Sequence, residues 1–186
     1  RLTDYCNLYR NIPDIIESVR NLLIKVSEDL RYELLLSIRF RIIGETVLTI
    51  AAERGHTALC VTLLSSLPPA DRLKLILVDK YTALHWAAYR GYTETVSGIL
   101  NCLTADQQLQ LLFTQDNNGD TALHDAAQCR HPEAMKNLLD NLTPEQQLKI
   151  LSVQKSNGDT ALHDAARRGH TETVKTLLDN LTPEQQ

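Results

Sequence analysis

The stretch that decides the fold is GDTALHDAA, which stands at residues 119–127 and again, letter for letter, at residues 158–166. An active site is normally built once in a chain, so a histidine–aspartate pair that recurs at a fixed offset is typical of a structural repeat. Adjacent residues on a helix point in different directions, so His124 does not face Asp125 as the members of a catalytic relay do. No serine or cysteine nucleophile recurs beside the pair. The pattern therefore predicts a building unit rather than an enzyme.

The unit occurs four times, beginning near residues 44, 80, 119 and 158. Each copy has an anchoring threonine, and the spacings are 36, 39 and 39 residues: Thr46, Thr82, Thr121 and Thr160. Threonine is a good N-cap, and apolar residues at i, i+3 and i+4 after it predict a short first helix. Three copies then have a glycine where that helix must end in a left-handed conformation: Gly55, Gly91 and Gly169. The third copy has Arg130 there, which should cost some stability.

These residues resemble the ankyrin repeat, whose pattern G-x-T-P-L-H-x-A-A-x-x-G-H followed by V-x-x-L-L is similar to GDTALHDAARRGHTETVKTLL at 158–178. Alanine replaces the family's proline, which weakens the first helical turn little. The resemblance covers residues 44–186 and implies an all-α solenoid of stacked helix-turn-helix units. It also implies that His85, His124 and His163 hydrogen-bond near their own threonines and tie adjacent turns together.

The period of 36–39 residues exceeds the roughly 33 residues usual for the family. The excess falls after the second helix, in segments 103–115 and 142–154. Thr143 with Gln146, like Thr104 with Gln107, has the spacing of a capping box. The sequence thus predicts an extra short connector helix in each repeat.

The two ends of the chain differ from the central copies. Residues 1–43 lack the threonine–leucine–histidine pattern, yet segment 21–38 parallels 137–153, so we expect a helical N-terminal cap or degenerate repeat. The C-terminal LTPEQQ at 181–186 begins another connector. We therefore expect repeats over 44–186, cut within the last connector, and a longer parent protein.

Composition excludes several classes of function. The formal net charge is −4, which gives no electrostatic reason to bind nucleic acid or an anionic membrane. Four widely spaced cysteines contain no C-x-x-C, which fits a reducing compartment. We expect a monomeric cytoplasmic module without cofactor or metal; secretion into a host cell and zinc binding by the histidines are the alternatives. Cys129 is a candidate reactive thiol, although a structural role is favoured.

The resemblance implies that partners bind the concave face of the first helices and the turn tips. Candidate partner-binding residues on that face and those tips are Trp86, Tyr89, Arg90, Asn117, Asn118, Asp120, Asp125, Gln128, Asn157, Asp159, Asp164, Arg167 and Arg168. Trp86 stands where its counterparts are aspartates, and Trp, Tyr and Arg dominate binding hot spots. We expect Trp86 to be either an interface anchor or a residue that packs on the N-terminal cap.

Three functions are compatible with this pattern. The first is a non-catalytic protein-interaction scaffold, because a rigid repeat face lowers the ordering cost of binding. The second is the targeting part of a larger effector or toxin whose active domain lies outside residues 1–186. The third is an architectural segment, such as a domain of a membrane protein. A catalytic signature or a hydrophobic span in the flanking sequence would separate them.

Overall fold

The computed structural model describes residues 12–37, 45–140 and 142–179, and nearly all regular structure in them is helical. Two helices precede the repeats: α2 Ile12–Ile24 and α3 Glu28–Ser37. They lie in the predicted cap. Residues 1–11 and 38–43 of that cap, and the truncated connector at 180–186, lie outside the described residues.

Repeats 1 to 3 each contain a first helix, a second helix and a connector helix. In repeat 1 (44–79) these are α4 Val47–Glu53, α5 Thr57–Ser65 and α6 Pro69–Ile76. In repeat 2 (80–118) they are α7 Ala83–Arg90, α8 Thr93–Asn101 and α9 Ala105–Leu112. In repeat 3 (119–157) they are α10 Ala122–Gln128, α11 Pro132–Leu139 and α12 Pro144–Leu151. Repeat 4 (158–186) contributes α13 Ala161–Arg167 and α14 Thr171–Asp179.

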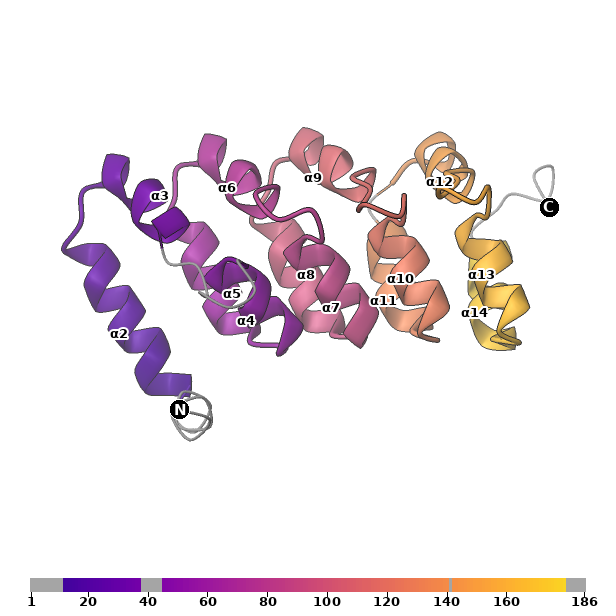
Figure 1. Ribbon diagram of the computed structural model, residues 1–186, viewed down its shortest axis with the longest axis horizontal. Helices are drawn as coiled ribbons and strands as arrows, with labels where there is room; N and C mark the ends of the chain where they lie inside the picture. Colours follow the sequence, from indigo (N-terminus) through magenta and orange to yellow (C-terminus); the bar gives the residue numbers. More distant parts are fainter. Residues whose placement is uncertain (1–11, 38–44, 141, 180–186) are drawn as a thin grey trace.

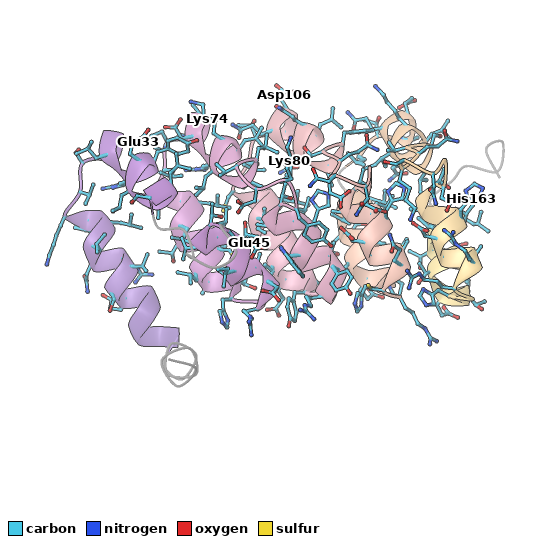
Figure 2. All side chains as sticks on the ribbon, in the orientation of Figure 1. Glu33, Glu45, Lys74, Lys80, Asp106 and His163 are labelled. Carbon is cyan, nitrogen blue, oxygen red and sulfur yellow. The ribbon has the colours of Figure 1, made fainter. Side chains whose placement is uncertain are left out.

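The repeats stack side by side into an elongated array (Figure 1). First helices pack on first helices, in the order α4, α7, α10 and α13, and second helices pack on second helices. The connector helices line one long edge, with Lys74 of α6 and Asp106 of α9 on that edge (Figure 2). The predicted connector helices are thus confirmed. We call the exposed side of α4, α7, α10 and α13 the first-helix face.

One continuous apolar core runs through the array, from Leu23 of the cap to Leu177 of repeat 4. Small alanines such as Ala87 and Ala126 let neighbouring first helices approach closely and are fully buried. The second helices supply the larger side chains, for example Ile99 and Met135. Helices pack both within each repeat and against the neighbouring repeats, so the continuous core depends on the stack.

Two signals at the helix ends behave as the sequence predicts. Thr104 and Thr143 form capping boxes with the glutamines three residues on. The glycines that end first helices are left-handed, with φ of +72° at Gly55, +72° at Gly91 and +70° at Gly169. Arg130 takes the same conformation with φ +62°, so repeat 3 carries a strained non-glycine residue.

A side chain near the start of each connector caps the end of the second helix before it, a contact that the sequence pattern alone does not predict. Gln108 donates to the Leu100 and Leu103 carbonyls, and Gln147 donates to the Leu139 carbonyl. Where arginine occupies this position, its longer side chain also donates a hydrogen bond to a carbonyl of the next repeat. Arg72 donates from Nε to the Leu67 carbonyl (3.0 Å) and from Nη1 to the Cys102 carbonyl (2.9 Å).

Candidate functional site

The repeated histidines brace the turns from which the first helices start. The Nδ1 atom of each ring lies within hydrogen-bond distance of the Oγ1 of its own threonine in three pairs: 2.8 Å for Thr82–His85, 2.9 Å for Thr121–His124 and 2.8 Å for Thr160–His163. The backbone N–H of each threonine also donates to the same ring nitrogen. The motif histidines therefore organise the backbone of their own repeat.

The histidine of repeat 2 also reaches into the next repeat. His85 Nε2 lies 3.1 Å from the Asp120 carbonyl, and burial lowers the pKa of His85, which suits a neutral ring that accepts at Nδ1 and donates at Nε2. Repeat 1 has Thr49 instead, and its Oγ1 donates to Asp79 Oδ2 at 2.6 Å. The ring of His124 is placed likewise, but its Nε2 has no hydrogen-bond partner among the described residues.

The structure differs from the sequence-based expectation in the exposure of three candidate binding residues. Asp120, Asp125 and Asp164 are buried rather than displayed on the first-helix face. The reason is the repeat register: the residue before each threonine faces the residue four places after the threonine of the next repeat. Through this register Glu45 acts on Trp86 and Tyr81 acts on Asp125.

Repeats 3 and 4 meet through an ion-pair network at this register. Lys155 Nζ lies 2.8 Å from Asp164 Oδ2 and 3.5 Å from Asp120 Oδ1. Arg167 reaches Asp164 from the surface and also pairs with Asp159. Two cations thus compensate the buried Asp164 carboxylate, which satisfies the usual condition for burying a charge.

Asp125 occupies the same position one repeat earlier, without those cations. The residue equivalent to Lys155 is Asp116, and the residue equivalent to Arg167 is Gln128, which donates to Asp120 Oδ1 at 2.9 Å. The Tyr81 hydroxyl comes close enough to lower the pKa of Asp125, but burial raises it more, to about 8. Asp125 Oδ2 has no hydrogen-bond partner among the described residues.

An aromatic cluster lies on the first-helix face of repeat 2. The Trp86 ring stands edge-to-face with Tyr81 at 4.8 Å and with Tyr89 at 6.0 Å between centroids. The Arg90 guanidinium lies 5.7 Å from both the Trp86 and the Tyr89 centroids, and it pairs with Glu53 at 2.9 Å. Trp86 itself is half-buried, and Tyr89 remains 39% exposed. The aromatic and cation contacts of Trp86 therefore lie within its own repeat, while Glu45 of repeat 1 approaches its side chain.

The turn tips form a second part of the candidate surface. Turns 116–120 and 155–159 touch directly, because the Ser156 N–H donates to the Asn118 carbonyl at 2.9 Å. Between them is an open cavity of about 450 Å³, lined by Asn117, Asn118, Asp120, Lys155, Ser156 and Asn157. Four of these were predicted from the sequence. Lys155 was not, because its importance depends on a contact between two repeats.

The remaining candidates are at or near the surface. Arg167 and Arg168 are exposed, whereas Gln128 and Asp159 are half-buried. Arg168 Nη2 donates to Gln128 Oε1 at 3.2 Å, which joins α13 to α10.

Burial raises the pKa of two thiols in the described part of the chain. Burial and the nearby Asp125 carboxylate raise the pKa of Cys129, which lowers the thiolate fraction that nucleophilic chemistry needs. Cys60 is fully buried, and burial raises the pKa of its thiol to about 12. Among the described residues there is also no group of three or more histidine, cysteine or acidic side chains arranged to hold a metal ion.

No helix in residues 12–37, 45–140 or 142–179 is long and apolar enough to cross a membrane. None of the curated proteins compared with this chain matches it. The family described as ankyrin repeats (3 copies) does match, over residues 14–111, 48–150 and 108–186. These matches span nearly the whole chain and include most of the predicted cap. With its stacked three-helix units and its threonine–histidine braces, the chain belongs to the ankyrin repeat family.

Proposed function

We propose that this chain is a non-catalytic docking module that binds a protein partner on the first-helix face, with the aromatic cluster of repeat 2 as its anchor. Ankyrin repeats are in general protein–protein interaction modules. The observation that carries the proposal is the position of Trp86, which is aromatic where repeats 3 and 4 bury an aspartate. It stands beside the exposed Tyr89 and the guanidinium of Arg90.

The chemistry of the cluster supports an anchor. Trp and Tyr supply a large apolar area with only two rotatable side-chain bonds each, so little entropy is lost when a partner covers them, and Arg is enriched with them in binding hot spots. The edge-to-face stacking of Trp86 on Tyr81 and Tyr89 fixes the ring before binding. We propose the cavity between turns 116–120 and 155–159, which is lined by amide, hydroxyl, carboxylate and ammonium groups, as a second contact region for the partner.

Site-specific photo-crosslinking tests the proposal. A photoreactive phenylalanine replaces Tyr89 on the first-helix face or, as the matched control, Lys136, which is exposed on the second helix α11. We expect a defined protein crosslink from position 89 that Trp86→Ala weakens about 30-fold in affinity, and none from position 136. Crosslinks that come from position 136 alone, or that Trp86→Ala leaves unchanged, would refute docking on this face.

A further inference from the structure

Repeats 3 and 4 provide an internal comparison, because residues 119–127 and 158–166 are identical while their surroundings differ. In repeat 4 the motif aspartate, Asp164, is paired with Lys155 and Arg167. In repeat 3 the motif aspartate, Asp125, has an acid and an amide at the two equivalent positions. The same buried carboxyl group is thus compensated in one repeat and uncompensated in the other.

The groups that face Asp125 come from three elements. Tyr81 precedes α7, Asp116 and Asp120 belong to the turn before α10, and Lys155 belongs to the turn before α13. The two acids raise the pKa of Asp125, and Lys155 lowers it. Lys155 already contacts Asp120 of repeat 3 and Asp164 of repeat 4, so its ammonium group is shared and is not dedicated to Asp125.

Two arginines on the neighbouring surface do not fill this place. Arg90 and Arg168 both act on Cys129, the residue four places after Asp125. Arg90 is bonded to Glu53, and Arg168 is bonded to Gln128. The carboxyl group of Asp125 is therefore a buried acceptor whose Oδ2 atom has no partner in the described part of the chain.

Repeat 4 shows the route by which a cation reaches this position. The Arg167 side chain is 56% exposed, yet its guanidinium bridges Asp159 and the buried Asp164. Gln128, at the equivalent position, satisfies Asp120 alone. Asp125 is 5% exposed and Asp164 only 1%, so burial does not prevent a guanidinium on the first-helix face from reaching such a carboxylate.

We propose that Asp125 is the receptor for an arginine side chain of the protein partner, whose guanidinium takes at Asp125 the position that Arg167 takes at Asp164. The inference rests on the proposed docking function and specifies the chemistry of the partner. The adjacent aromatic rings of Tyr81, Trp86 and Tyr89 suit a guanidinium, which stacks on aromatic faces. An arginine in the partner would supply in trans the cation that repeat 3 lacks.

The first test uses the purified chain and a short peptide, acetyl-Ser-Arg-Ser-amide, with the citrulline peptide as its uncharged match. The Asp125 side-chain carboxyl ¹³C signal, assigned by its loss in Asp125→Asn, is followed as each peptide is added. We expect the arginine peptide to shift this signal and to move its titration midpoint to lower pH, and the citrulline peptide to do neither. Equal effects of the two peptides, or no effect of either, would overturn the arginine site.

The second test introduces the missing cation within the chain. Gln128→Arg should raise Tm by about 2–4 °C in the otherwise unchanged chain, and should give no such gain when combined with Asp125→Asn. Equal gains in both backgrounds would show that the new guanidinium does not reach Asp125. Neither test contains the partner protein, so a negative result would refute only the arginine site at Asp125. The docking proposal would still be tested separately by the crosslinks from position 89.

Discussion

Tyr81 and Asp125 face each other across the boundary between repeats 2 and 3, at the register where Asp120 and Asp164 share Lys155 one repeat later. Burial and the nearby Asp125 carboxylate raise the pKa of the Tyr81 hydroxyl, so Tyr81 stays a neutral donor at ordinary pH. The motif aspartate thus faces a phenol at one boundary, where Asp125 meets Tyr81, and an ammonium group at the next, where Asp164 meets Lys155. The two boundaries should therefore respond differently to pH.

Asp125→Asn should stabilise the array at neutral pH. The pKa of Asp125 in the folded chain, about 8, lies above its ordinary 3.8, so the folded state keeps a proton that the unfolded state releases. This contribution to stability is fully present below pH 4 and falls by about 1 kcal/mol per pH unit between roughly pH 4 and 8. Denaturant unfolding of both proteins at pH 5 and pH 7.5 should show an advantage of Asp125→Asn that grows with pH. An advantage that stays constant, or a less stable variant at pH 7.5, would contradict the prediction.

Asp164→Asn is the matched variant in the identical motif, and it should lower stability. The change leaves Lys155 and Arg167 without the carboxylate that both contact. A loss of about 1–3 kcal/mol in the free energy of unfolding is expected from hydrogen bonds to charged groups. Salt titration of the unfolding curves checks the cause, because added salt should weaken the wild-type advantage. A neutral effect of Asp164→Asn would mean that the network contributes nothing.

Gly119 and Gly158 stand at the same turn position, and alanine should affect them unequally. Both are left-handed, with φ of +82° and +87°, so each alanine variant pays about 1 kcal/mol of backbone strain. A Cβ at Gly119 would also lie 2.8 Å from the Ser156 backbone nitrogen, whereas a Cβ at Gly158 meets nothing within 4 Å. Gly119→Ala should therefore lose clearly more stability than Gly158→Ala and expose the Ser156 amide to hydrogen exchange. Equal losses would show that the two turns do not touch in solution.

Arg130→Gly should stabilise repeat 3. Arg130 has φ +62° at the position that glycine occupies in the other three repeats. Release of this strain stabilises the folded state, whereas the larger conformational entropy of glycine stabilises the unfolded state. The net effect should be a rise of roughly 0.5–1 kcal/mol in the free energy of unfolding. Arg54→Gly, one residue before the glycine of repeat 1, is the control and should not stabilise. A loss of stability in Arg130→Gly would mean that the arginine side chain contributes more than its backbone costs.

Arg72→Gln should loosen the boundary between repeats 1 and 2. Glutamine at the equivalent positions, Gln108 and Gln147, caps only the helix before it. The variant should therefore keep the bond to the Leu67 carbonyl and lose the bond to the Cys102 carbonyl, at a cost of about 1 kcal/mol. Faster amide exchange in α6 and α9, with the repeat 3–4 boundary unchanged, is the expected pattern. Unchanged exchange in α6 and α9 would contradict it.

Much of the fold was predictable because it depends on local sequence patterns that recur in each repeat. The threonine caps, the left-handed glycines and the capping boxes of α9 and α12 each involve residues three or four places apart. The connector helices followed from the lengthened period and from those boxes. Even the conformation of Arg130 followed from the glycines at its equivalents.

The candidate site was less predictable, because its chemistry arises between repeats. The sequence placed Asp120, Asp125 and Asp164 on an exposed face, but the stack of repeats buries them, for example Asp125 beside Tyr81 of the preceding repeat. Lys155 and Tyr81 were missed for the same reason. One signal was available: alignment of the repeats at their threonines sets Asp116 against Lys155 and Gln128 against Arg167.

The carboxyl group of Asp125 gives the most direct test of the central claim, that the repeated motif is structural and that its third copy lacks the cations of its fourth. A pH titration of the Asp125 side-chain ¹³C signal in the chain alone, with Asp125→Asn for assignment, measures this in one experiment. We predict a midpoint at about pH 8. A midpoint near the ordinary value for aspartate, close to pH 4, would mean that a cation already sits beside Asp125, and it would contradict both the uncompensated carboxyl and the arginine site built on it.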